Sequence, residues 1–107
     1  MSTGIKYSVR DIEKDFGKLS FAKALQAHRL ADETSLKDFA QFLKISPQSL
    51  CDLEKGRKIP SPERAARIAK ALKEPIAYWV SLALQDLLNE QKLNLVVHVL
   101  NRPKKAA

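Results

Sequence analysis

The sequence predicts an all-α fold, and three observations support this prediction. Apolar residues recur three and four positions apart along most of residues 21–91, the spacing expected of helices that bury one face. The two stretches on either side of residue 45 are separated by a tight turn, which predicts a pair of short, packed helices. A serine stands at the N-cap position before four of the helical stretches, at Ser20, Ser35, Ser46 and Ser61.

Residues 1–19 are predicted to be an extension with one short helix. Val9, Ile12 and Phe16 recur at helical spacing, and Gly17 stands where a helix over about 9–16 would end. Two functions are open for this helix, packing on the domain or contact with a second subunit or partner.

The next helix is predicted over about 21–31, where Phe21, Ala24, Leu25 and His28 share one face. His28 is a lone histidine on an apolar stripe. We interpret it as a core or boundary residue rather than as a ligand or a catalyst.

Residues 35–55 contain the pattern that organises the chain. Ser46 followed by Pro47 opens the second helix of the pair, because the hydroxyl can accept a free N–H and proline suits the first helical position. Apolar side chains form one stripe of the first helix, at Leu36, Phe39, Ala40 and Leu43. Two short helices in this arrangement form a helix-turn-helix unit.

Residues 39–61, FAQFLKISPQSLCDLEKGRKIPS, resemble the helix-turn-helix of the lambda-repressor/Cro-like regulators (the XRE family). The usual pattern of that family is LAxxLGISxxxLSxxExGxxxPS, and the two align without a gap. The resemblance covers roughly residues 20–73. It implies a lambda-repressor-like, five-helix DNA-binding domain, here over 20–91, whose recognition helix at about 47–55 enters the major groove of double-stranded DNA.

Three positions depart from the family pattern. Leu36 replaces a glutamine that often bonds a phosphate in the family. Lys44 replaces the glycine of the turn, and a non-glycine residue at positive φ costs on the order of 1 kcal/mol. Pro47 replaces a residue that often touches DNA, so base recognition is expected to shift to its neighbours.

The polar face of the recognition helix supplies the candidate DNA-binding residues, because Leu50 and Leu53 are expected to point to the core. Residues in the first turn reach base edges in this docking mode, and glutamine can bond adenine through two atoms. Cations after the helix are expected to contact phosphates. The candidates are Ser46, Gln48, Ser49, Asp52, Lys55, Arg57 and Lys58. Lys55 is expected to contact either a guanine or a phosphate. Asp52 is expected either to accept a hydrogen bond from cytosine or to repel phosphate.

The resemblance also implies one structural ion pair. In the family, an arginine at the position of Arg29 pairs with the glutamate that corresponds to Glu54. We expect this salt bridge to be partly buried and to fix the first helix of the domain against the recognition helix.

The C-terminal part suggests association with a second chain. A helix over about 75–91 is apolar on more than one side, and Leu93 to Leu100 alternates with the period of a β-strand. A single strand needs a partner, so residues 92–107 are predicted to hold a dimerising strand followed by a basic tail. The expected dimer or partner contacts are Trp79, Leu84, Leu88, Leu95, Val97 and Val99.

The bulk composition agrees with a polyanion partner. Lysine and arginine number 19 against 12 acidic residues, a net charge of +7. The single cysteine, Cys51, excludes an intrachain disulfide and a multi-cysteine zinc site, and no catalytic constellation or cofactor motif is visible. No signal peptide or membrane span is apparent, so a cytoplasmic location is expected.

These observations predict a dimeric, sequence-specific transcriptional regulator, most simply a repressor of a palindromic operator. An antitoxin that represses its own operon, with a toxin as its protein partner, is a narrower version. The alternative is a protein-interaction module that sequesters a partner through its C-terminal strand, with DNA binding secondary.

Overall fold

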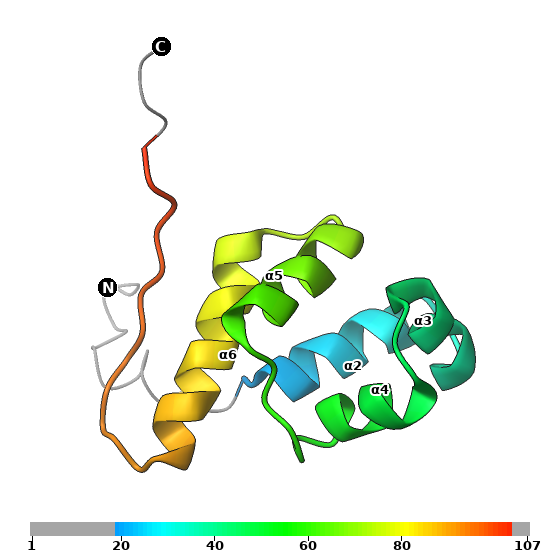
Figure 1. Cartoon of the computed structure of the whole chain (residues 1–107), viewed down its shortest axis with the longest axis horizontal. Coiled ribbons are helices and arrows are strands. Elements are labelled where there is room, and N and C mark those ends of the chain that lie inside the picture. Colours follow the sequence, from blue (N-terminus) through cyan, green and yellow to red (C-terminus); the bar gives the residue numbers. More distant parts are fainter. Residues whose placement is uncertain (1–18, 104–107) are drawn as a thin grey trace, which may run out of the picture.

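Five helices make up the ordered body of the protein. The computed structural model describes residues 19–103, and the short helix expected at 9–16 lies outside that range. The helices are α2 (Phe21–Ala31), α3 (Leu36–Leu43), α4 (Pro47–Glu54), α5 (Pro62–Ala71) and α6 (Ile76–Glu90). In Figure 1, α3 lies beyond the C-terminal end of α2, α4 runs alongside α2, and α5 packs beside α6. The prediction of an all-α, five-helix domain is thereby confirmed for this part of the chain.

Serine side chains begin four of the five helices, as the sequence predicted. Ser20, Ser35, Ser46 and Ser61 each accept a hydrogen bond from the backbone N–H three residues later. Each bond satisfies one of the N–H groups that the first turn of a helix leaves without a backbone partner. The start of each helix is therefore fixed by its local sequence.

One hydrophobic core joins all five helices. Phe21 and Leu25 of α2 are completely enclosed, and the ring of Phe21 meets Trp79 edge-on with centroids 5.4 Å apart. Leu50 and Leu53 bring α4 onto the same core. His28 lies at the boundary, about 6.4 Å between ring centroids from both Phe39 and Trp79.

Trp79 corrects one expectation. It was expected at a dimer or partner contact, but only 3% of it is exposed, because α6 turns this side chain toward α2. The broad apolar surface of α6 is explained partly by the core of its own chain, to which Leu82 and Ala83 also contribute.

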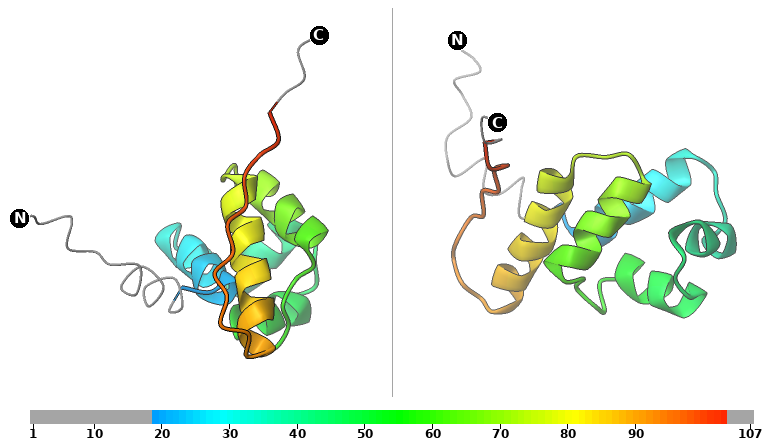
Figure 2. Two further views of the ribbon diagram at one scale, coloured as in Figure 1. Left: turned by 90° about the vertical axis from the view of Figure 1, so that its left-hand side faces the viewer. Right: turned by 45° about the horizontal axis from the view of Figure 1, so that its top comes forward.

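The expected C-terminal strand is also wrong for the described residues, among which no strand is present. The segment after α6 is extended and runs back beside that helix (Figure 2). Gln85 explains this placement. Its buried side-chain amide donates to the carbonyl of Leu95 and accepts from the N–H of Val97, both at 2.8 Å. One side chain thus makes the two bonds that a neighbouring strand would supply.

None of the helices in the described range has the length and apolar character needed to cross a bilayer.

Candidate nucleic-acid interface

The turn between α3 and α4 fixes the angle of the candidate recognition helix. Lys44 adopts the left-handed conformation with φ 60°, and its N–H bonds back to the end of α3. The N–H of Ile45 donates to the carbonyl of Ala40 at 3.0 Å, and Ile45 packs against the core. Ser46 then begins α4 at once. This left-handed conformation is strained for a lysine, whereas a glycine would adopt it without strain.

Helix α4 presents two different faces. Leu50 and Leu53 are buried on one side, while Gln48 is exposed and Ser49 half-exposed in the first turn of the other. Ser46 caps this turn, because its Oγ accepts from the N–H of Ser49 and also donates to the Ser49 hydroxyl at 3.0 Å. The first turn of α4 therefore offers polar side chains and the positive end of a helix dipole to an external partner.

A buried ion pair locks α4 to α2. Arg29 Nε donates to Glu54 Oε2 at 2.7 Å, and Nη2 donates to Oε1 at 2.9 Å. A third bond runs from Nη1 to the carbonyl of Thr34, just before α3. The hydrogen bonds to Glu54 raise the pKa of Arg29 above its usual value. The guanidinium thus connects α2, the start of α3 and the end of α4 at one point.

Three candidate residues form a connected polar cluster on the outer side of α4. Asp52 Oδ1 accepts from Gln48 Nε2 and from Arg57 Nη1, each at 3.1 Å. The hydrogen bond from Arg57 lowers the pKa of Asp52, and the same bond raises the pKa of the guanidinium. This cluster was not predicted from the sequence. Its signal was the position of Gly56, which with φ 73° turns the chain back so that Arg57 reaches the helix it has just left.

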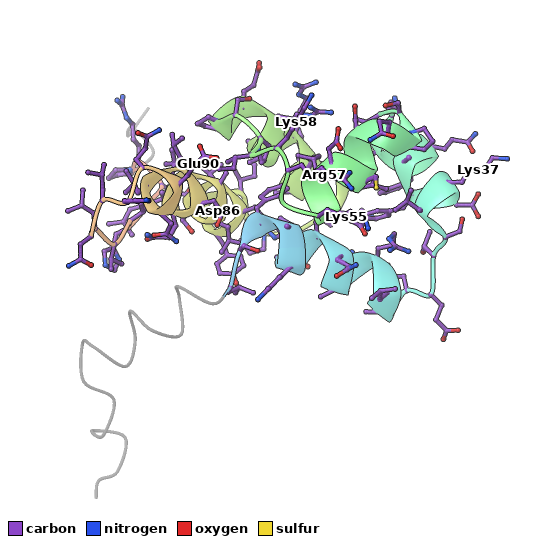
Figure 3. All side chains as sticks on the ribbon, turned by 90° about the horizontal axis from the view of Figure 1, so that it is seen from below. Lys37, Lys55, Arg57, Lys58, Asp86 and Glu90 are labelled. Carbon is purple, nitrogen blue, oxygen red and sulfur yellow. The ribbon has the colours of Figure 1, made fainter. Side chains whose placement is uncertain are left out.

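Lys55 and Lys58 are exposed, and among the described residues neither side chain forms an ion pair. Figure 3 shows Lys55, Arg57 and Lys58 together near the end of α4, with Lys37 separately on α3. Lys37 was not among the candidates. It lies in the first turn of α3, next to the departure at Leu36, and apart from the other three cations.

The face also has an acidic boundary. Asp86 and Glu90 of α6 line a cleft of about 330 Å³ that Lys58 and Gly56 also line. Asp86 Oδ2 accepts from the N–H of Phe21 at 3.0 Å. Burial raises the pKa of the Asp86 carboxyl, and the bond from Phe21 partly opposes that effect. Asp86 was not predicted to accept a hydrogen bond from the start of α2, because it lies 65 residues from Phe21 in the sequence.

Comparison with known proteins agrees with this geometry. Residues 25–79 match the family described as Helix-turn-helix. The chain belongs to the XRE family of helix-turn-helix proteins. It also resembles the crystal structure of ClgR, the clp gene regulator from C. glutamicum, at 30% sequence identity and a TM-score of 0.50. That match covers 63% of this chain and 87% of ClgR. A search of curated proteins found no significant match.

This membership makes the protein a DNA-binding transcriptional regulator. The seven candidate DNA-binding residues lie at the N-cap of α4, on α4 itself and in the loop after it. The remaining expected contact residues are dispersed along α6 and the segment that follows. Leu84, Leu88, Val97 and Val99 are half-buried, and Leu95 is exposed.

Proposed function

We propose that this regulator is a repressor that binds a palindromic operator as a homodimer and recognises sequence through α4. The observation that carries the proposal is the exposed polar first turn of α4, held at a fixed angle by its buried leucines and by the Arg29–Glu54 pair. Residues at this position of a recognition helix contact base edges in the major groove. Binding there would exclude polymerase from a promoter.

Gln48 and Ser49 are the proposed base-reading residues. A glutamine amide can bond N6 and N7 of adenine together, and a serine hydroxyl can bond several base edges. Gln48 would exchange its bond to Asp52 for the base, since both involve the same amide group. Lys55 lies at the C-cap of α4, about two turns after Gln48, and would reach a guanine or a phosphate.

Arg57, Lys58 and the N-terminus of α4 at Ser46 are the proposed phosphate contacts. Such contacts supply affinity and fix the register without reading sequence. Asp52 takes part indirectly in this proposal, because it holds Arg57 against α4 at 3.1 Å.

Dimerisation is proposed through α6 and the C-terminal segment, with Leu84, Leu88, Leu95, Val97 and Val99 as contacts. Two α4 helices related by a twofold axis would then enter successive major grooves about 34 Å apart. The DNA-binding unit would comprise residues 20–91 and act in the cytoplasm. An autoregulating antitoxin with a toxin partner is a narrower form of the same proposal.

The second candidate function is a protein-interaction module. Three exposed leucines in the C-terminal segment support it, namely Leu93, Leu95 and Leu100. A partner that covered them would bury apolar surface that water now contacts.

A salt titration on selected DNA tests the leading proposal. Binding sites would first be selected from a pool of random duplexes, and the affinity for the best site and for a scrambled site would be measured over a range of salt concentrations. The Arg57→Ala, Lys58→Ala double variant should reduce the salt slope by about 2, because each phosphate contact contributes about 1. Gln48→Ala should instead remove the preference for the selected site and leave the scrambled site unchanged.

A double variant of exposed α5-side lysines, Lys70→Ala, Lys73→Ala, is the matched charge control and should keep the parent slope. If the Arg57, Lys58 and Gln48 variants all behave like the parent, α4 is not the recognition helix. A selection that yields no preferred sequence would favour the protein-interaction module. Sedimentation of the protein with a full site should give two chains per duplex if the dimer is correct.

A further inference from the structure

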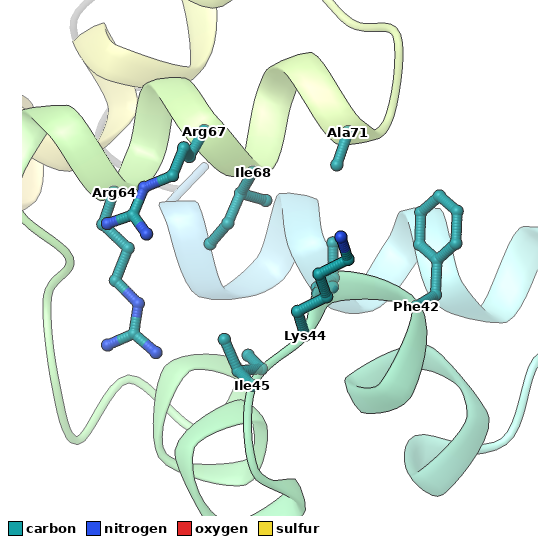
Figure 4. A pocket seen from close by; sticks show the side chains of 8 residues that line it. Phe42, Lys44, Ile45, Arg64, Arg67, Ile68 and Ala71 are labelled. Atoms are coloured by element: carbon teal, nitrogen blue, oxygen red, sulfur yellow. The ribbon is translucent and has the colours of Figure 1, made fainter.

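A groove of about 270 Å³ lies between α5 and the turn that joins α3 to α4. It does not include any residue of the polar face of α4. Leu43, Ile45 and Ile68 line its apolar part, and all three belong to or pack against the hydrophobic core. Figure 4 shows that the groove is open, with α5 on one side and the turn on the other.

Cations dominate the polar part of the groove. Lys44, Arg64 and Arg67 line it, and no acidic residue does. In Figure 4 the three side chains extend around the opening from two different elements. Among residues 19–103, the side chains of Lys44 and Arg64 form no ion pair or hydrogen bond, so their charges are available to a bound anion.

Arg67 has one acidic neighbour, which is too weak to neutralise it. Glu63 Oε1 lies 3.9 Å from Arg67 Nη2, and the two side chains are 87% and 71% exposed. Exposed pairs of this kind are screened by water and salt. The groove therefore keeps a local excess of positive charge beside an apolar surface.

Phe42 adds an exposed aromatic ring at one end of the groove. It is 57% exposed, although its ring stacks on Phe39 with centroids 6.4 Å apart. An aromatic ring left in water beside an apolar groove gains from any ligand that covers it.

We propose that this groove binds a small amphipathic carboxylate, with an aliphatic or aromatic body against Leu43, Ile45, Ile68 and Phe42. The carboxylate accepts from Arg64 and Arg67, whose planar guanidinium groups suit the two oxygens of such a group. The volume lies just below the range of about 300–1,000 Å³ usual for ligand pockets, which limits the ligand to the size of a small metabolite. The site is independent of the proposed base-reading residues.

Decanoate is a suitable probe, and decanol is its uncharged counterpart. Amide chemical shifts of the isotope-labelled full chain would be followed while each probe is added. Decanoate should shift residues 42–46 and 64–71 saturably and with one dissociation constant. Decanol should bind at least about tenfold more weakly, since it lacks the charge-assisted hydrogen bonds.

The Arg64→Gln, Arg67→Gln double variant should weaken decanoate binding by about tenfold or more, while Lys70→Gln, Lys73→Gln should bind as the parent does. Unchanged far-ultraviolet circular dichroism would show that the variants remain folded. The proposal is overturned by any of three results: no saturable shift below about 1 mM decanoate, equal binding of decanol, or unchanged binding by the Arg64, Arg67 variant. Shifts distributed over the whole protein would likewise overturn it, since they indicate nonspecific adsorption.

Discussion

Replacing Arg29 with alanine tests whether the angle of α4 depends on one buried ion pair. The side chain is 13% exposed and its partner Glu54 is 3% exposed, so the carboxylate has little access to water. The substitution removes two hydrogen bonds to Glu54 and one to the carbonyl of Thr34. Glu54 would be left in the core with its charge uncompensated.

Breaking a buried pair from one side destabilises a protein by about 3–5 kcal/mol. The partial exposure of Arg29 allows some water to enter after truncation, so we expect the lower end, about 3 kcal/mol. Native domains have a free energy of unfolding of about 5–15 kcal/mol, so this loss is a large fraction of the total. The melting temperature should fall by roughly 10–20 °C for a domain of this size.

Urea unfolding followed by circular dichroism measures this loss. The control is the apolar double variant Arg29→Met, Glu54→Leu, which removes both charges together and should recover most of the parent stability. The single variants Arg29→Met and Glu54→Leu complete a double-mutant cycle with it and give the coupling energy of the pair. If the free energy of unfolding of Arg29→Ala lies within about 0.5 kcal/mol of the parent value, water already screens the pair, and the pair does not fix the angle of α4.

Three further substitutions test local features of the fold. Lys44→Gly should stabilise the protein by up to about 1 kcal/mol in urea unfolding, because glycine relieves the φ of 60° in the turn; a loss of stability would contradict the strain argument. Ser46→Ala should lower the free energy of unfolding by about 1 kcal/mol through loss of the cap on the Ser49 N–H, and Ser46→Asp should restore most of it. Asp86→Asn tests whether burial raises the pKa of the Asp86 carboxyl, so that its ionised form destabilises the folded state. The stability that Asp86 contributes is complete below its unfolded pKa and is lost as the pH rises through the folded pKa, so the Asn variant should be the more stable at neutral pH and equal to the parent near about pH 3. A difference that stays constant across that range would refute the desolvation argument.

The helices could be predicted from sequence because their signals are local. A capping bond joins residues only three positions apart, so Ser20, Ser35, Ser46 and Ser61 fix the helix starts without knowledge of the fold. The positive φ at Lys44 followed from the resemblance to the family, whose pattern has a glycine at this position of the turn. The family pattern then indicated which helix faces outward.

The C-terminal segment could not be predicted because its partner is a single side chain distant from the local pattern. Alternating Leu93, Leu95 and Val97 have the period of a strand in any extended conformation, whether or not another strand is adjacent. Gln85 satisfies the backbone of this segment from within a helix that otherwise has a strongly apolar sequence. A glutamine on so apolar a helix was the indication that another segment packs against it, because a buried amide needs hydrogen-bond partners.

The cluster on α4 shows how separate sequence candidates become one unit in the fold. Gln48 and Arg57 both donate to Oδ1 of Asp52, so a change at any of the three alters the environment of the other two. Effects of substitutions within such a network are not additive. Gln48→Ala removes a base-reading amide and also leaves Asp52 bonded to Arg57 alone, whereas Asp52→Ala removes the acceptor of both Gln48 and Arg57. A base-reading function for Gln48 is therefore supported only if Gln48→Ala still changes sequence preference in the Asp52→Ala background, where position 52 has no side-chain acceptor for Gln48.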